Sequence, residues 1–404
     1  MTNLAVYVTT EQKFILHKGR FYAEAIGGQE FWQRYLDVFK SVKIVARVKP
    51  VENLRDNVLY VEGEGIEVIP IPYFYSGWCR LFMLPALLMH TRKATVQDSA
   101  FILRVPGLVG TFVSIWLCLR RWPYAVELVG DPYDSLSSQA LGKWWGDLLR
   151  IPFVYALRRQ CQQAVAAAYV TRETLQKRYP PDGRFTTHYS SITLNPDLLA
   201  FGAKRFRGRQ YGRVNSNHHR LIFVGSLSQR YKGLHVLLEA LHLCQTAGWD
   251  LELMVLGDGF YRAEYERLAE SMQLHNVIFH GYLKGGQAVF EQLAEADLFV
   301  MPSLVEGLPR AMIEAMACGL PCIGSIVGGI PELLAIEDLV PPGDAPALAS
   351  KIRQVLADPA KMQEMGERNF HTSLEYHPDR LRERRNAFYQ FVHDATMDRI
   401  SGKS

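Results

Sequence analysis

The sequence predicts an α/β protein made of two doubly wound domains that face each other across a cleft. In both halves of the 404-residue chain, short apolar segments typical of buried strands alternate with segments of helical spacing. A polar, basic stretch without apolar periodicity, residues 201–219, separates the halves. Because open α/β sheets bind ligands at the carboxyl ends of their strands, we expect the ligand site there.

The elements of the first half follow in order. A strand at 4–9 precedes the Gly27-Gly28 pair, which is followed by a helix with apolar residues at Phe31, Tyr35, Val38 and Phe39. Further strands are expected at 42–48, 66–71, 99–105, 124–129 and 166–170. Helices are expected at 80–92, interrupted by Pro85, and at 108–120 and 144–165.

The second half repeats this alternation. Strands are expected at 220–224, 250–256, 276–279, 297–301 and 321–326, and helices at 233–247, 261–273, 286–295, 309–318, 345–357 and 360–368. The predicted domains are therefore 1–200 and 220–375, joined by the 201–219 linker. We expect the charged C-terminal segment 376–404, with its helix at about 378–397, to pack back on the first domain.

Composition favours an ordinary cytoplasmic protein. Apolar residues make up 48% and charged residues 21% of the chain. The six cysteines do not have zinc-binding spacing, so we expect free thiols and no metal site. Net charge is +4, with residues 1–200 carrying 23 Lys and Arg against 17 Asp and Glu, and nothing in the pattern indicates nucleic-acid binding.

The sequence indicates neither a secretory signal nor a membrane span. The N-terminus has no basic region leading into an apolar one, and the apolar windows 81–89 and 108–119 are shorter than the roughly 20 residues that a span needs. Residues 73–92 combine aromatic, apolar and basic side chains. They are either a helix buried on the sheet or an interfacial helix at the anionic inner face of the plasma membrane.

Residues 302–321, PSLVEGLPRAMIEAMACGLP, have the strongest chemical character. A strand ends just before them, Gly307 lets the backbone approach a ligand, and Pro309 suits the first turn of a helix. The free N–H groups of that turn favour an anion. Glu306 and Glu314 lie about 10 Å apart along this segment, so they are too far apart to share a proton but suited to hold different hydroxyls of one ligand. Alternatively, Glu306 is a charge near the helix N-terminus that is favourable to the helix dipole, and Glu314 is an exposed helix glutamate.

This block resembles the EX7E motif of GT-B glycosyltransferases, in particular the retaining family called glycosyltransferase family 4 or group 1. VGSLSQRYKG (224–233), VLGDGFYRAEYERLA (255–269), VIFHGYL (277–283), ADLFVMPS (296–303) and GGIPELL (328–334) match the family in the same order. The resemblance covers about 150 residues. It implies a GT-B fold, a nucleotide-sugar donor, retention of configuration and independence of metals.

The resemblance also implies roles for individual residues. Arg230 and Lys232 match the basic pair that neutralises the donor diphosphate as negative charge grows on the leaving group. Glu306 matches the glutamate on the donor sugar, and Glu314 the one on the ribose hydroxyls. The remaining donor-binding positions are Gly28, Gly225, Ser226, Tyr282, Leu283, Gly307 and Leu308.

The first domain departs from the family pattern. Where many relatives have a histidine near the reacting sugar, this chain reads ELVGDPYDS, with Asp131 at that place. Asp131 is either a catalytic group facing the acceptor or a turn residue. Arg104, at the end of the strand FILRV, is a candidate for binding an acidic acceptor or a phosphate.

The predicted function is transfer of a sugar from a nucleoside diphosphate to an acceptor hydroxyl, with Glu306, Asp131, Lys232 and Arg230 as catalytic residues. The expected acceptor is a lipid-linked or other saccharide in cell-surface polysaccharide or glycoconjugate synthesis. Two alternatives are a GT-B nucleotide-sugar epimerase or hydrolase, and a non-catalytic module that binds sugar nucleotides.

Overall fold

The structure is a computed structural model that describes residues 4–24, 27–54, 58–73, 79–95, 98–136, 146–208, 218–283 and 286–402. Its contacts divide the chain into two compact units. Unit 1 comprises Met1–Tyr133, Leu149–Tyr189 and Arg382–Ser404, and unit 2 comprises Asp134–Leu148 and Ser190–Leu381. Each unit is an α/β body with a mostly parallel sheet, as the alternating sequence pattern predicts.

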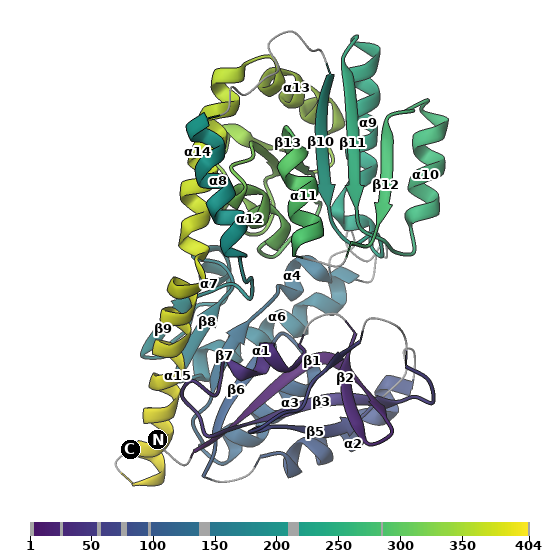
Figure 1. Cartoon of the computed structure of the whole chain (residues 1–404). Coiled ribbons are helices and arrows are strands. Elements are labelled where there is room, and N and C mark those ends of the chain that lie inside the picture. The colour runs from purple at the N-terminus through teal and green to yellow at the C-terminus, as the bar shows by residue number, and fades with distance from the viewer. Residues whose placement is uncertain are drawn as a thin grey trace. The chain divides into compact units, whose positions relative to one another are not determined.

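Unit 1 is built on the strands β1 to β9, with helices inserted between them; all of these strands except β4 are labelled in Figure 1. Its strands are β1 (Ala5–His17), β2 (Arg20–Ala23), β3 (Ser41–Pro50), β4 (Leu59–Tyr60), β5 (Ile66–Pro72), β6 (Ala100–Val105), β7 (Ala125–Leu128), β8 (Ala166–Tyr169) and β9 (Phe185–His188). Its helices include α1 (Gln29–Gln33), α2 (Cys79–Lys93), α3 (Leu108–Leu119), α6 (Gly146–Gln163), α7 (Thr174–Arg178) and α15 (Pro378–Ile400), with the short α4 (Pro132–Ser135) after β7.

The sheet of unit 1 is parallel except at one edge, where β2 pairs antiparallel with both β1 and β4. Strand β1 is much longer than the predicted 4–9, because its second half forms a hairpin with β2. Lys18 and Gly19 form the turn, both with positive φ (46° and 78°), which suits the right-handed twist of a hairpin. The sequence pattern did not predict this hairpin or the strands β4 and β9.

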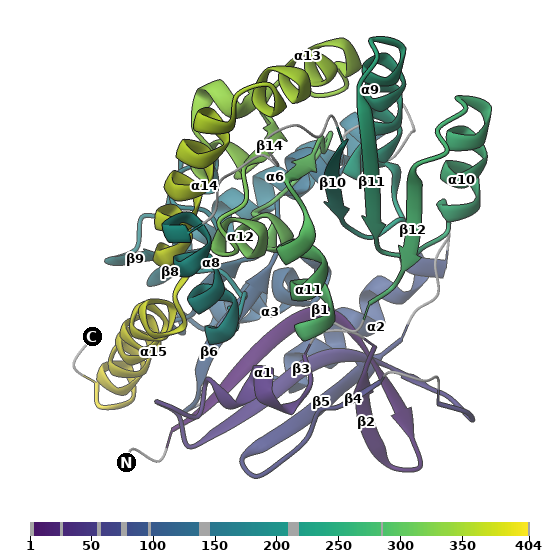
Figure 2. The ribbon, with the colours of Figure 1, turned by 45° about the horizontal axis from the view of Figure 1, so that its top comes forward.

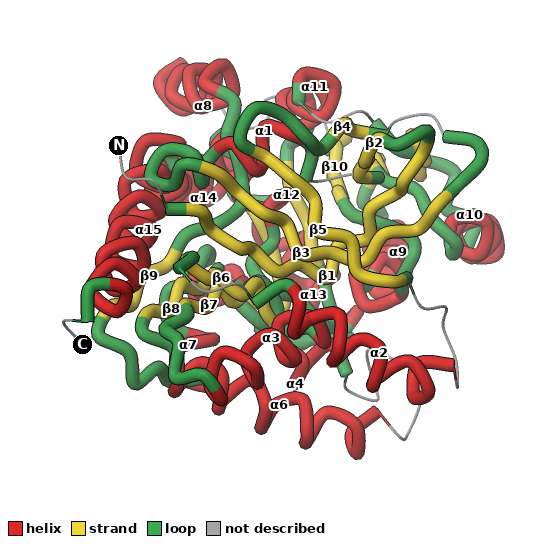
Figure 3. The backbone as a smooth tube through the Cα atoms, turned by 90° about the horizontal axis from the view of Figure 1, so that it is seen from below, coloured by secondary structure: helices red, strands yellow, loops and turns green. Residues whose placement is uncertain are grey.

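Helices α2, α3 and α6 lie side by side over one face of the unit 1 sheet (Figure 3). The side chains beneath them form a core that joins these helices to the strands, including Leu87 of α2, Val113 and Leu117 of α3, and Leu157 of α6. These three helices agree closely with the predicted ranges 80–92, 108–120 and 144–165.

Unit 2 contains a six-stranded sheet in the order β12-β11-β10-β13-β14-β15, and every pairing in it is parallel. Helices α9 and α13 pack against each other beside this sheet (Figure 2). The strands are β10 (His218–Val224), β11 (Asp250–Leu256), β12 (Val277–Gly281), β13 (Leu298–Met301), β14 (Cys322–Ser325) and β15 (Leu339–Val340). The helices are α8 (Pro196–Gly208), α9 (Leu234–Thr246), α10 (Arg262–Ser271), α11 (Gln287–Glu295), α12 (Arg310–Ala317), α13 (Ala345–Leu356) and α14 (Pro359–Ser373).

The predicted linker needs correction, because residues 201–208 belong to helix α8 and lie within unit 2. Arg205 is buried, and its guanidinium donates to the carbonyl of Ala296 at 2.5 Å and to the last turn of α11. A Cβ on Gly202 would lie 2.0 Å from the carbonyl oxygen of Ala317, so the helix packs closely there. The basic run that suggested a linker therefore contributes a buried arginine. Of the rest of the predicted linker, residues 218–219 belong to β10, and 209–217 lie outside the described residues.

Within the described ranges, none of the helices combines the length and the apolar character that crossing a bilayer requires. The apolar windows at 81–89 and 108–119 fall in α2 and α3.

Candidate donor-binding site

The predicted donor residues of unit 2 gather where its strand order reverses. Strand β10 pairs with β11 on one side and with β13 on the other, through Leu221 with Leu298 and Ile222 with Phe299. The loops that follow β10 and β13 therefore leave the sheet at the same edge. A reversal of this kind is where open α/β sheets form ligand sites.

The centre of the site is an ion pair between these two loops. Lys232 Nζ lies 2.6 Å from Glu306 Oε2, and the side chains are only 17% and 10% exposed. The hydroxyl of Ser303 is 3.3 Å from the same carboxylate oxygen. Taking two charges out of water is costly, so a partly buried pair is weak as a stabilising device. Its position at a ligand edge favours a binding role.

Backbone contacts hold both loops in place. Leu304 N–H donates to the carbonyl of Tyr231 at 2.7 Å, which joins the loop after β13 to the 3₁₀ turn Arg230–Lys232. A Cβ on Gly233, whose φ is 75°, would lie 1.9 Å from the carbonyl oxygen of Pro302. A side chain at this position would push the two loops apart. The spacing of Lys232 and Glu306 thus depends on the glycine between them.

The start of helix α12 is open to an anion. No side chain among the described residues caps this helix at Pro309, and the N–H groups of a first helical turn have no acceptor within the helix. A Cβ on Gly307 would meet no atom within 4 Å, whereas the neighbouring backbone is braced by Gly329 N–H, which donates to the carbonyl of Gly307 at 2.7 Å. The hydrogen bond from Gly329 thus holds the loop in place, and the space beside Gly307 is open to an anion.

Glu314 lies in the middle of α12 and is half-buried. Its carboxylate accepts no hydrogen bond from any residue that the structure describes. Burial raises the pKa of this carboxyl, and Arg310, one turn earlier in the helix, only partly offsets the effect. The residue is only half-buried and its carboxylate has no hydrogen-bond partner among the described residues, so a ligand hydroxyl can reach it.

Arg230 does not join the ion pair at Glu306. Its guanidinium donates to Glu264 at 2.7 Å, lies over the Tyr261 ring and is 60% exposed. Gly225 and Ser226 lie in the same loop, where Gly225 N–H donates to the carbonyl of Leu256 at 2.9 Å and Ser226 accepts from Ser228 N–H. The structure thus brings Lys232 to Glu306 and aims Arg230 at α10.

Three residues predicted to contact the donor lie in the loops around this edge, and their side chains form no hydrogen bond with any residue that the structure describes. Leu308 precedes α12, and Tyr282, 64% exposed, and Leu283 follow β12. Their contacts to a nucleotide stay predictions.

In unit 1, Asp131 already has partners for both of its oxygens. Arg178 and the hydroxyl of Tyr179, the latter at 2.5 Å, bind its carboxylate, and Tyr133 N–H donates to it at 2.8 Å. Its side chain is 5% exposed. This arrangement is that of a turn residue at the start of α4, which is the second of the two interpretations that the sequence left open. A catalytic role for Asp131 stays a prediction.

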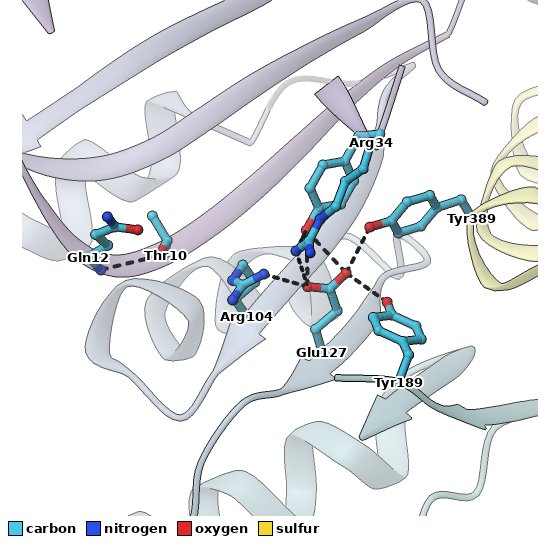
Figure 4. Close-up of polar contacts among 8 residues, drawn as sticks. Thr10, Gln12, Arg34, Arg104, Glu127, Tyr189 and Tyr389 are labelled. Atoms are coloured by element: carbon cyan, nitrogen blue, oxygen red, sulfur yellow. Dashed lines mark hydrogen bonds and ion pairs between the residues drawn. The ribbon is translucent and has the colours of Figure 1, made fainter. Parts of the chain in front are cut away.

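Arg104 lies in a buried cluster around Glu127 of β7 (Figure 4). The carboxylate of Glu127 accepts from Arg104 at 3.0 Å. It also accepts from the hydroxyls of Tyr35, Tyr189 and Tyr389, at 3.0, 2.8 and 3.3 Å. Burial tends to raise its pKa, but Arg104 and Arg34 outweigh this effect and the pKa is lowered. An acceptor-binding role for Arg104 stays a prediction.

Gly28 lies just before α1, and its backbone is extended, with φ of −63° and ψ of 176°. A Cβ there would lie 3.0 Å from the Cβ of Leu59, so close packing alone accounts for a glycine. Its contact with a donor also stays a prediction.

Sequence reasoning missed Glu127 and Ser303. A charged residue in the apolar segment AVELV was a signal, because a buried carboxylate needs a partner. It also missed a cavity of about 750 Å³ in unit 1, which is lined by residues of α15 and of the segments just before β7 and β9, among them Phe391, Trp122 and Arg184. None of the predicted site residues lines this cavity.

Comparison with known proteins agrees with this geometry. Residues 218–358 match the family described as Glycosyl transferases group 1. The Staphylococcus aureus protein CapJ is 26% identical over 339 residues, which are 84% of this chain and 83% of that protein. A putative colanic acid biosynthesis glycosyltransferase, WcaL of Salmonella typhimurium, is 36% identical over 143 residues, about a third of each chain.

Solved structures match the whole chain in fold. A sucrose-phosphate synthase of Thermosynechococcus elongatus has a TM-score of 0.70 and 19% identity, with 97% of this chain and all of that one covered. HepE of Anabaena in complex with UDP has a TM-score of 0.61 and 16% identity, with 98% of this chain covered and all of that one.

The two parallel-sheet units and their match to these structures define a GT-B glycosyltransferase fold. Residues 218–358 match the group 1 glycosyltransferase family, and the chain as a whole shares the fold of these enzymes.

Proposed function

We propose that this enzyme transfers a sugar from a nucleoside diphosphate sugar to an acceptor hydroxyl, with retention of configuration and without a metal. The pairing of Lys232 with Glu306, beside the open start of α12, is the observation on which this proposal rests. HepE, which shares the fold, was solved with UDP-glucose, so a UDP-sugar is the first donor to test.

The residues of unit 2 divide the work of holding such a donor. Lys232 and the N–H groups of α12 bind the diphosphate, where negative charge grows as the sugar–oxygen bond breaks. Glu306 orients the sugar, and Glu314 accepts hydrogen bonds from the ribose hydroxyls. Fixed cations of this kind perform the charge neutralisation that a metal performs elsewhere.

The proposed acceptor is a lipid-linked or other saccharide in the assembly of a cell-surface polysaccharide. Relatives with names from colanic acid and amylovoran biosynthesis support this choice. We further propose that the enzyme works at the inner face of the plasma membrane. Asp131 and Arg104 are left out of the proposed reaction, because buried partners in unit 1 already hold them.

Two substitutions test the proposal. Lys232→Ala and Glu306→Ala should each lower transferase turnover about a hundredfold or more, the effect of removing a group that stabilises transition-state charge. Arg230→Ala, in the same loop but paired with Glu264, should cost less. Product formation from UDP-sugars is measured with and without EDTA, and NMR of the product reports retention.

The outcomes separate the candidates. Near wild-type turnover in Lys232→Ala or Glu306→Ala would refute the site. Consumption of the donor with no sugar transferred to any saccharide acceptor would instead indicate an epimerase or hydrolase. Loss of activity in EDTA would refute independence of metals.

A further inference from the structure

Helices α2, α3 and α6 form a continuous layer on unit 1, here called the helical face (Figure 3). Trp116 of α3 donates its indole N–H to the carbonyl of Leu88 on α2 at 2.9 Å. Gln160 of α6 donates to the hydroxyl of Thr111 on α3 at 2.8 Å. These contacts hold the three helices together as one surface, whose inner side covers the core.

The outer side of the helical face exposes large apolar side chains. Leu119 is 71% exposed, Ile151 64%, Tyr155 65% and Met89 52%. In α3 and α6 they lie opposite buried residues such as Leu117 and Leu157, so each helix is apolar on two sides. Single exposed apolar residues are ordinary, but a group of them on one helical layer indicates an interaction surface.

The same layer is strongly basic. Residues 79–93, 108–121 and 146–163 contain eight Lys and Arg against one Asp, whereas α10 of unit 2 has two Arg against three Glu. The exposed basic residues are Arg92, Lys93, Arg120, Arg121, Arg158 and Arg159. None of these six forms an ion pair with an acid among the described residues. Arg120 donates to the main-chain and hydroxyl oxygens of Thr95, and Arg158 donates to the main-chain carbonyl of Arg178. Their positive charge is therefore not neutralised.

We propose that the helical face docks on the surface of an anionic lipid bilayer. Exposed aliphatic and aromatic side chains among unneutralised cations suit the boundary between headgroups and acyl chains, where apolar groups insert and cations meet lipid phosphates. A nucleic acid would use the cations but leave Leu119 and Ile151 without apolar partners. The proposal extends the expected interfacial role of residues 73–92 to α3 and α6, and it rests on the proposed function for its purpose, access to a membrane acceptor.

The wild-type protein is tested by co-sedimentation with phosphatidylcholine vesicles, with and without phosphatidylglycerol. We expect binding only to vesicles with phosphatidylglycerol, and release as salt rises above about 0.1 M, where charges farther apart than about 10 Å are screened. No binding to the anionic vesicles, or equal binding to both kinds, would overturn the proposal.

Matched variants locate the surface. Arg159→Glu should lower the partition coefficient about fivefold or more, because a single cation near an anionic surface contributes about that factor. Leu119→Asp should lower it by about as much, because it replaces an inserted apolar group with an anion. Ile336→Asp is the control, since Ile336 is 72% exposed but lies in unit 2. Equal loss in Ile336→Asp, or none in Leu119→Asp and Arg159→Glu, would contradict the assignment.

The donor site provides an independent readout. UDP binding by Leu119→Asp and Arg159→Glu should equal that of the wild type, because neither residue lies among the donor loops. If vesicle binding fails while UDP binding persists, the membrane proposal falls alone. If UDP binding fails while vesicle binding persists, the proposed function falls and the surface stands.

Discussion

Two glutamates show how differently this molecule treats a carboxylate removed from water. Glu127, in unit 1, is 2% exposed and accepts hydrogen bonds from three tyrosines and an arginine. Glu314, in unit 2, is half-buried and its carboxylate has no hydrogen-bond partner among the described residues. The pKa of Glu127 is lowered and that of Glu314 is raised.

The cause of this difference lies in the neighbours, since burial acts to raise both pKa values. At Glu127, Arg104 and Arg34 outweigh burial, helped by the hydroxyls of Tyr189 and Tyr35. At Glu314, the positive charge of Arg310 lowers the pKa by less than burial raises it. We interpret the fully buried charge of Glu127, which the protein itself neutralises, as structural, and the half-buried carboxylate of Glu314, whose pKa is raised, as available to a ligand.

The largest expected effect comes from Glu127→Gln, which leaves the guanidinium groups of Arg104 and Arg34 buried without their counter-charge. Breaking a buried pair in this way costs about 3–5 kcal/mol of the free energy of unfolding. Chemical denaturation measures it. The control is Glu67→Gln, because Glu67 is 60% exposed and its pair with Lys43 at 3.6 Å contributes about 1 kcal/mol or less.

The pH dependence sharpens this prediction. Because the native pKa of Glu127 lies below its ordinary value of 4.5, its stabilisation is present above pH 4.5 and is lost as the pH falls toward the native pKa. The stability gap between wild type and Glu127→Gln should therefore narrow in acid. A difference in the free energy of unfolding that is small at neutral pH, or that does not change with pH, would show that Glu127 does not stabilise the fold.

A smaller effect of opposite sign is expected from Glu314→Gln. The native carboxyl holds its proton more tightly than the unfolded chain does, so its charged form lowers stability at neutral pH. Removing that charge should raise the free energy of unfolding by about 1 kcal/mol, and the gain should fade as the pH falls through the raised pKa.

Denaturation at neutral and acid pH checks this sign, with Glu270→Gln as control, since Glu270 is an exposed residue of α10. A Glu314→Gln protein less stable than the wild type at neutral pH would show that the carboxylate has a structural partner.

The donor loops and the Glu127 cluster also differ in how much of their structure could be predicted from the sequence. The helix 309–318 and its glutamates could be predicted from the sequence, because proline, glycine and the two acids lie within one short segment. The alternation of strands and helices predicted parallel sheets but not the strand order that places Lys232 beside Glu306. Joint donor roles for these two residues were expected only from the resemblance to the family, because they lie far apart in the sequence.

The contacts of Glu127 could not be predicted from the sequence, because its tyrosines come from positions 35, 189 and 389, which no local pattern connects. For the same reason Arg104 and Asp131 were assigned to the acceptor side from their places at strand ends, while their partners were invisible. Arg205 was interpreted as part of a solvated run, because only the folded chain brings the carbonyls of α11 to it.

The most direct test of the account is a calorimetric titration of UDP into the wild type, Lys232→Ala and Glu314→Ala. We expect the wild type to bind, and each variant to bind at least about tenfold more weakly, because hydrogen bonds to a charged group contribute about 1.5–3 kcal/mol. Equal affinity in all three proteins, or no binding by the wild type to UDP or to any other nucleoside diphosphate, would contradict the claim that these residues form the donor site.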